Sequence, residues 1–268
     1  MSFEGSDFAM PHPINRIVPN PHVFLDNTIL KDKPDYAILV CEIFATWARI
    51  EQELDFLLVR LLGPNAAPAL AMYETLTAQH LQLGALNAAA KAILPTDELE
   101  VFQAATSVAE GAQTPRNHLA HWAWAGCKQR PDLLALADPD MLHQRDFNVA
   151  KKVHSNPAEL SMLEVYTTNM FVDSKILAYS KSDLERALRD LKEAYMALYF
   201  LAMYIDPNYY VNLAHPYPEF RLTREETRSE ALERLNGLRL FREALARIRA
   251  GRKSTPQSPR GSNPQGLA

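Results

Sequence analysis

Residues 35–62 read DYAILVCEIFATWARIEQELDFLLVRLL and are followed directly by Gly63 and Pro64. Apolar side chains recur in this stretch every three or four residues, which is the period of an amphipathic α-helix. They are Ile38, Cys41, Ile43, Phe44, Trp47, Ile50, Leu54, Leu57, Leu58 and Leu61. Gly and Pro directly after such a run mark a helix end. The stretch therefore predicts one long helix, and with it a mainly helical fold.

The same period and a series of capping residues predict five further helices. Asp97 with Glu100, the pair Ser182-Asp183, and Thr223 with Glu226 each have the residue types that cap a helix N-terminus. The predicted helices span residues 66–76, 78–94, 98–111, 183–205 and 223–250. The last of them is rich in Arg and Glu.

Short apolar segments between residues 122 and 180 favour strands. Trp122–Cys127 and Asp132–Ala137 flank the turn-forming residues 128–131, and Leu163–Thr167 precedes Lys175–Tyr179 in the same way. Two apolar runs around a short polar turn are typical of a β-hairpin. We therefore expect a small β insertion in the helical fold.

Together these elements predict a mainly α protein: an antiparallel helical bundle with a small β insertion and a basic C-terminal helix. Residues 1–33 contain four prolines and no sustained period, so they predict an extended arm. The tail is rich in Gly, Pro and Ser, which predicts disorder. The expected segments are 1–33 (arm), 34–206 (bundle, with the insertion at about 122–180), 207–250 (loop and helix) and 251–268 (tail).

The richest chemistry lies in Arg116-Asn117-His118-Leu119-Ala120-His121, which follows Thr114-Pro115. Thr is a favoured N-cap and Pro is favoured at the first helical position, so a helix is expected to start or restart at Pro115. Arg116 and Asn117 would then lie in a first turn, where unpaired N–H groups favour an anion. A phosphate could bind there.

Arginine matches phosphate oxygens with a planar set of donors, and histidine exchanges protons near neutral pH. The two could bind and cleave a phosphodiester without a metal. At about 100° per residue, Asn117 and His121 lie roughly 40° apart on a helix, but Arg116 and His121 lie roughly 140° apart. Either the long Arg116 side chain wraps around the helix, or a second copy of the chain supplies the histidine across a two-fold axis.

These residues resemble the HEPN superfamily of helical domains, in which an Arg is followed by four to six residues and a His, commonly with Asn after the Arg. Arg116, Asn117 and His121 match with four intervening residues, and Trp124 is similar to an aromatic that some members carry shortly after the His. Gly often follows that His, whereas Trp122 does here. The resemblance covers about residues 35–125 and includes Trp47, Glu51 and Leu54 in the first long helix.

The resemblance implies metal-independent RNA cleavage by a homodimer, with the 2′-hydroxyl as nucleophile. It implies that Arg116 binds the phosphate, His121 transfers protons and Asn117 orients the pair, with Glu51 and His118 in support. Proteins of this kind often belong to defence or toxin–antitoxin systems, so an antitoxin or another protein partner is expected. Many members of the superfamily lack activity.

A non-catalytic role fits the same residues. Arg116 and Asn117 could satisfy a helix terminus or pair with Glu51, and His121 could fill a polar niche beneath the tryptophans. The alternative function is therefore a helical module that binds RNA, a nucleotide or a protein.

Several function classes lose support because their signatures are absent from the sequence. There is no Walker loop, GxSxG, HExxH, dinucleotide fingerprint or CxxC pair, so we expect no cofactor and no metal. Two cysteines, Cys41 and Cys127, suit a reducing compartment, and the most apolar stretch, Tyr195–Ile205, is about half a membrane span. We expect a cytoplasmic protein without a membrane segment.

Charge is divided unevenly along the chain, whose formal net charge is −4. From Arg221 onward there are eleven basic and five acidic residues, a net charge of +6, while the first 220 residues carry −10. The basic end is expected to be a solvated helix face and tail that folds against the acidic body. An arm that contacts RNA is the alternative.

Overall fold

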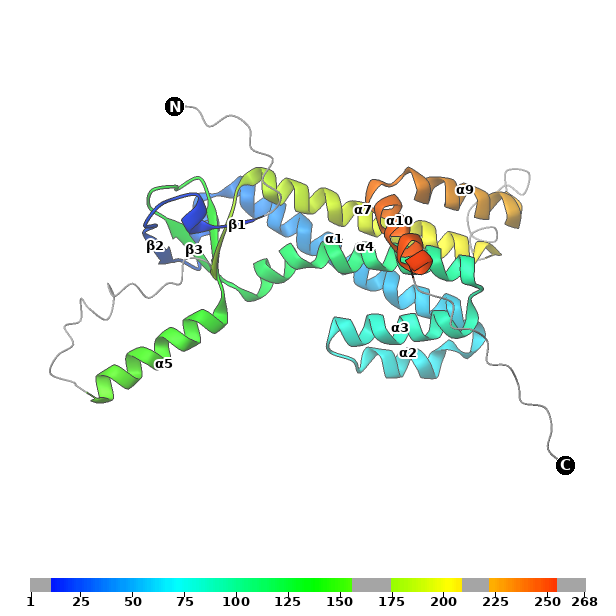
Figure 1. The fold of residues 1–268 in the computed structure, drawn as a ribbon, viewed down its shortest axis with the longest axis horizontal. Helices are drawn as coiled ribbons and strands as arrows, with labels where there is room; N and C mark the ends of the chain where they lie inside the picture. Colours follow the sequence, from blue (N-terminus) through cyan, green and yellow to red (C-terminus); the bar gives the residue numbers. More distant parts are fainter. Residues whose placement is uncertain (1–10, 156–174, 209–221, 255–268) are drawn as a thin grey trace. The chain divides into compact units, whose positions relative to one another are not determined.

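The computed structural model describes residues 11–155, 175–208 and 222–254, which are mainly helical with one small sheet (Figure 1). Contacts divide the chain into two compact units. We call residues 1–50 with 110–192 unit 1, and residues 51–109 with 193–268 unit 2. The sheet lies in unit 1.

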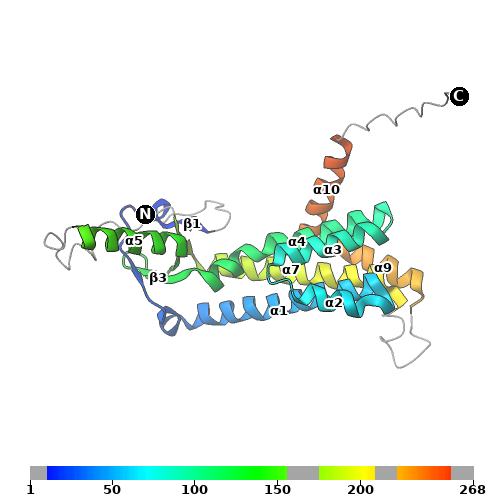
Figure 2. The same cartoon turned by 90° about the horizontal axis from the view of Figure 1, so that it is seen from below.

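Eight α-helices are present in the part of the chain that the structure describes, and Figure 2 shows α1, α4 and α7 as long uninterrupted helices. Their bounds are Pro34–Leu62 (α1), Ala66–Glu74 (α2), Gln79–Ile93 (α3), Thr96–His121 (α4), Pro139–Ser155 (α5), Lys181–Ile205 (α7), Arg224–Gly237 (α9) and Arg239–Ser254 (α10). None of these described helices combines the length and the apolar character needed to span a bilayer.

The sequence predicts α1, α2, α3 and α7 within two residues at nearly every end. Gly63 ends α1 with φ +59°, a left-handed conformation that glycine adopts without strain. The predicted cap of α7 is wrong by two residues. Ser180 is the cap, because its Oγ accepts a hydrogen bond from the Asp183 backbone (3.2 Å) while Asp183 Oδ2 accepts one from the Ser180 backbone (2.9 Å).

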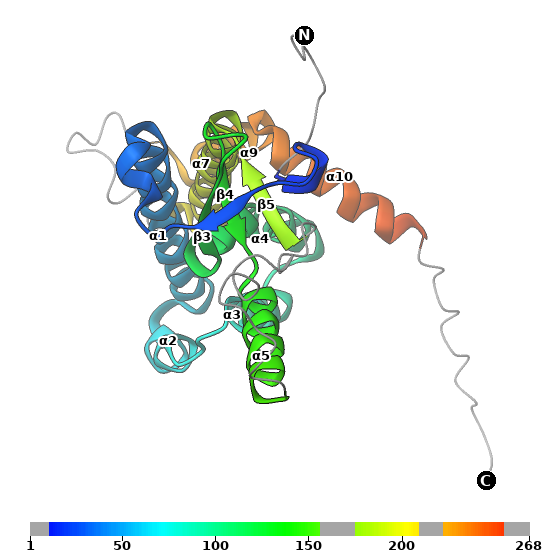
Figure 3. The same ribbon diagram turned by 90° about the vertical axis from the view of Figure 1, so that its left-hand side faces the viewer.

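Five short antiparallel strands form the sheet in the order β1-β5-β4-β3-β2, and Figure 3 labels β3, β4 and β5 among them. They are His12–Pro13 (β1), Val23–Leu25 (β2), Ala123–Cys127 (β3), Leu134–Ala137 (β4) and Ile176–Tyr179 (β5). The β3–β4 hairpin confirms the prediction, whereas the predicted Leu163–Thr167 strand lies outside the described residues. The arm expected at residues 1–33 supplies both edge strands, which the sequence did not reveal.

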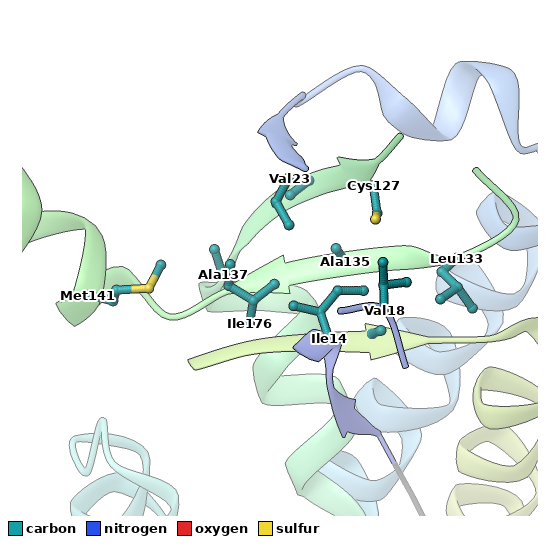
Figure 4. Packing of buried hydrophobic residues seen from close by; sticks show 11 residues of the cluster. Ile14, Val18, Val23, Cys127, Leu133, Ala135, Ala137, Met141 and Ile176 are labelled. Atoms are coloured by element: carbon teal, nitrogen blue, oxygen red, sulfur yellow. The ribbon is translucent and has the colours of Figure 1, made fainter. Parts of the chain in front are cut away.

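One face of the sheet is covered by the N-terminal segment itself. Ile14 and Val18 are buried in one cluster with small side chains of the inner strands, among them Ala135 and Ala137 (Figure 4). The alternate residues of β4 and β5 point to the opposite face, where Leu134 pairs in register with Tyr179, and both are fully buried. Burial on both faces explains why these strands are continuous apolar runs.

The basic C-terminal helix is two helices rather than one. Thr223 and Glu226 form the expected capping box, but the chain turns extended at Leu238 (φ −78°, ψ 129°), directly after Gly237. The second helix, α10, continues to Ser254, four residues beyond the predicted end, so residues 251–254 are helical rather than part of a tail. Residues 209–221 of the predicted loop, and the tail from 255, lie outside the described residues.

Acidic residues of α4 hold the basic helices within unit 2, as the charge split predicts. Arg228 of α9 pairs with Glu98. Arg249 and Arg252 of α10 both pair with Glu100, at 3.2 Å and 2.6 Å, and these contacts lower the pKa of the Glu100 carboxyl. This part of the chain therefore folds against an acidic helix surface.

Candidate functional site

The motif lies at the end of a helix and not at its beginning. Helix α4 runs from Thr96 to His121 without interruption, and Pro115 is inside it. Residues 98–111 are helical as predicted, but the predicted end before the motif, the predicted start at Pro115 and the predicted cap at Asp97 are wrong, because one helix begins at Thr96 and continues through Pro115. A stripe of buried side chains continues across the proline, and its members are Ala105, Val108, Ala112, Pro115 and Leu119. Packing along this stripe stabilises a helix that the local sequence would stop.

This position reverses the electrostatics expected for the motif. Arg116, Asn117 and His121 occupy the last two turns of α4, where carbonyl groups and the negative end of the helix dipole favour cations. The anion site expected at a helix N-terminus is therefore absent here. Any phosphate bound at this end depends on the Arg116 guanidinium and not on backbone N–H groups.

Replacing Pro115 with Ala tests the corrected helix. Inside a helix a proline removes one hydrogen bond and costs about 3 kcal/mol, so the P115A protein should be more stable by about 1 kcal/mol after the loss of buried ring carbons. Urea denaturation followed by circular dichroism measures this. A first-turn proline would give the opposite sign, and Thr114→Ala, which alters the expected cap alone, should change little.

Arg116 is held in place by two neighbours in unit 1. Its guanidinium carbon lies 5.5 Å from the ring centroid of Trp47, a buried residue of α1, and Nη1 donates a hydrogen bond to Asn117 Oδ1 at 3.2 Å. A guanidinium over an indole face is a favourable cation–π contact. Trp47 thus acts as a platform that fixes a half-buried Arg116, and the structure brings Arg116 and Asn117 together.

His118 points into the protein toward the sheet. Its Nδ1 lies 2.8 Å from the hydroxyl oxygen of Tyr179, and its ring centroid lies 4.3 Å from that of Trp122. Burial lowers the pKa of His118, although Asp138 acts in the opposite direction. Tyr179 and Asp138 were missed from the sequence, because nothing in a local pattern pairs residues 61 positions apart.

His121 is the last residue of α4 and is exposed. Because α4 is helical through the whole motif, Asn117 and His121 lie roughly 40° apart and Arg116 and His121 roughly 140° apart around its axis. His121, the candidate for proton transfer, and Arg116, the candidate for phosphate binding, therefore lie on different sides of α4.

Trp122, which directly follows α4, and Trp124 of strand β3 complete the end of the helix. Trp124 Nε1 donates to the Leu119 carbonyl at 3.0 Å, and the Trp122 backbone N–H donates to the His118 carbonyl at 2.9 Å. These carbonyls belong to the last turn, which has no intrahelical donors for them. Trp124, expected as an aromatic near the motif, thus has a defined capping role.

Glu51 is exposed on α1, and its support of Arg116 stays a prediction. It does influence the neighbouring turn of its own helix. Burial raises the pKa of Asp55, and the carboxylates of Glu74 and Glu51 raise it further. Repulsion among these groups marks an acidic surface in unit 2.

Two of the hollows in the described part of unit 1 are lined by residues outside the motif. One, of about 650 Å³, lies between the starts of α1 and α7 and includes Lys33, Tyr36 and Lys181. The other, of about 430 Å³, includes Phe24 and Cys127. Within the described ranges no group of three or more His, Cys, Asp or Glu side chains is placed to hold a metal ion.

Comparison with known proteins gives no relative from which a role could be transferred. No family model matches the chain, and neither a curated protein nor a solved structure is significantly similar to it.

Proposed function

We propose that this chain is a HEPN-like, metal-independent endoribonuclease that acts as a homodimer. The observation that carries the proposal is the arrangement at the end of α4. Arg116 is fixed by Trp47 and Asn117, while His121 is exposed one helical turn beyond Asn117. A positioned guanidinium and an accessible imidazole are the two groups that such cleavage requires.

In this reaction Arg116 binds the non-bridging oxygens of the scissile phosphate. His121 accepts the proton of the RNA 2′-hydroxyl, the 2′-oxygen bonds to phosphorus, and the bond from phosphorus to the 5′-oxygen breaks. The leaving 5′-oxygen takes a proton from water, and the products end in a 2′,3′-cyclic phosphate and a 5′-hydroxyl. Asn117 orients Arg116 through their hydrogen bond.

The need for two copies follows from the separation around α4. Two side chains roughly 140° apart on one helix do not meet at one phosphate. A two-fold axis that brings the ends of two α4 helices together would place Arg116 of one protomer near His121 of the partner subunit. A defence or toxin–antitoxin setting, with an inhibitory protein partner, belongs to the same proposal.

Incubation of the purified protein with mixed RNA in EDTA tests the activity. We expect cleavage without metal and products with cyclic phosphate ends. His121→Ala should reduce the rate at least about a hundredfold, the usual contribution of a general base. The matched control is His143→Ala, which removes an exposed histidine of α5.

The second candidate function is a non-catalytic helical module that binds RNA, a nucleotide or a protein. The contacts of Arg116 with Trp47 and of His118 with Tyr179 favour it, because both also serve the fold. RNA that stays intact with the wild-type protein, whether in EDTA or with added Mg²⁺, would contradict the nuclease and leave this candidate.

A further inference from the structure

Phe24 is an exposed aromatic side chain that the sheet holds in a defined place. It lies on the edge strand β2, pairs in register with Gly126 of β3 and is 41% exposed. Its ring covers the backbone of Gly126 so closely that a β-carbon at position 126 would lie 2.5 Å from Phe24 Cζ. The ring therefore occupies a seat that only a residue without a side chain can offer.

A hollow of about 430 Å³ adjoins this ring. Phe24 and Gly126 line it together with Ile29 and Leu133, which are both buried apolar residues. Its volume lies within the range of small-ligand sites, about 300–1,000 Å³. A nucleobase stacks on an exposed aromatic ring of this kind, because every base has a flat π-face.

Lys33 lies where this hollow meets the larger one between the starts of α1 and α7. Lys33 and Asp32 line both hollows, which we together call the Lys33 trough, and all of its lining residues belong to unit 1. The Lys33 ammonium donates a hydrogen bond to the Pro131 carbonyl and lies 5.4 Å from the centroid of the Tyr36 ring. A cation held next to an aromatic platform can bind the phosphate that is attached to a stacked base.

The acidic residues of the Lys33 trough favour a nucleotide over a bare anion. Three of them have partners within the chain: Asp26 accepts hydrogen bonds from the backbone and the hydroxyl of Thr28, Asp35 pairs with Lys181, and Asp132 pairs with Arg130. The fourth, Asp32, is exposed next to Lys33. Its carboxylate repels a free phosphate but accepts a hydrogen bond from the exocyclic amino group of a base.

We propose that the Lys33 trough binds one nucleotide of single-stranded RNA, with the base stacked on Phe24 and the phosphate on Lys33. Asp32 selects bases that carry an amino group, so adenine is preferred to uracil. The choice of RNA as ligand rests on the proposed function, whereas the trough as a nucleotide site rests on the contacts of Phe24 and Lys33.

Binding of a fluorescent 2′-O-methyl oligoadenylate of about six nucleotides tests the site. This probe has no free 2′-hydroxyl, so the proposed reaction cannot cleave it and the unaltered full chain can be titrated. Fluorescence anisotropy should show binding that Phe24→Ala weakens about tenfold, through the loss of stacking, and that Phe24→Trp retains. The matched control is Phe147→Ala, which removes a phenylalanine of α5 that is 69% exposed and should leave the affinity unchanged.

Gly126→Ala tests the position of the ring rather than its presence. The added β-carbon meets the far end of the Phe24 side chain, which can move away, so the variant should still fold and circular dichroism should confirm this. Displacement of the ring from its seat should weaken binding about as much as Phe24→Ala does. An aromatic residue at position 24 is thus not sufficient on its own.

Two charge substitutions test the remaining contacts. Lys33→Gln should weaken binding and lower the salt dependence by about one counterion, whereas Lys31→Gln, an exposed neighbour that lines neither of these hollows, should change both less. Wild-type protein should bind oligoadenylate about tenfold more tightly than oligouridylate. Asp32→Ala should bind the two alike, because the acceptor for the amino group is gone.

Equal affinities of wild type, Phe24→Ala and Gly126→Ala would overturn the proposal, as would competition by inorganic phosphate as strong as that by adenosine monophosphate. Binding that depends on Phe24 while RNA stays intact would support the nucleotide site and contradict the nuclease. Cleavage of RNA together with binding that is unchanged in Phe24→Ala would support the nuclease and overturn the nucleotide site, so the two proposals can fail separately.

Discussion

A mixture of Arg116→Ala and His121→Ala proteins is expected to recover about a quarter of the wild-type rate of RNA cleavage, although each variant alone is inactive. After subunit exchange about half of the dimers are heterodimers. In each heterodimer one site combines both substitutions, while the other combines the intact Arg116 and the intact His121. One quarter of all sites in the mixture therefore have both an intact Arg116 and an intact His121.

The recovery separates a shared site from a site within one chain. If Arg116 wrapped around α4 to reach the His121 of its own chain, the cleavage rate of a mixture would not exceed the sum of the rates of the two variants. A control mixture of Arg116→Ala with the double variant Arg116→Ala/His121→Ala contains no intact shared site and should stay inactive. Recovery in that control would show that stabilisation by the partner, and not complementation, restores the rate.

Trp47→Ala is expected to have the largest effect on stability among the substitutions near the motif. Trp47 is 2% exposed, and truncation of a buried Trp to Ala costs about 3–5 kcal/mol of unfolding free energy. The loss of the cation–π contact with Arg116 adds about 1 kcal/mol or less. Urea denaturation at neutral pH gives the difference from wild type.

Ile38→Ala is the matched control, because Ile38 is on the same helix and is 60% exposed. It should change the unfolding free energy by at most about 0.5 kcal/mol. Trp47→Phe keeps an aromatic platform beneath Arg116 and should fall between the two. A cost below about 1 kcal/mol for Trp47→Ala would mean that this indole does not anchor α1 and α4 in unit 1.

How far the sequence predicts this fold depends on the element. Helix α1 is predicted almost to the residue, because ten apolar positions repeat at helical spacing and Gly63 ends them with a left-handed turn. Helix α4 is predicted wrongly at one point, because Thr114-Pro115 has every local mark of a helix start. Its continuity depends on burial along the whole helix, which a local signal does not contain.

Strands, too, can be predicted only where their signal is local in the sequence. The β3–β4 hairpin has its two runs next to each other, so it could be found. Strands β1 and β2 have only two and three residues and lie among prolines, and they are strands only because β5 and β3 pair with them. The break between α9 and α10 was visible as Gly237, but the Arg and Glu on both sides favour one helix.

For the candidate site, the sequence predicts which residues belong to it, whereas the contacts of these residues are known only from the structure. The angular separation of Arg116 and His121 follows from helical spacing alone. The platform of Trp47, the bond from His118 to Tyr179 and the cap from Trp124 depend on segments that meet only after folding. Of these, only the presence of aromatic residues near the motif could be anticipated.

The edges of the sheet also set the order in which the protein can be built. Strand β2 has its partner once β3, at Ala123–Cys127, has left the ribosome, whereas β1 must wait for β5, which ends at Tyr179. Chain closure over such long separations is slow compared with helix formation. During synthesis, therefore, five of the eight described helices can form while β1 still lacks its partner, and the first strand to be made is among the last to be paired.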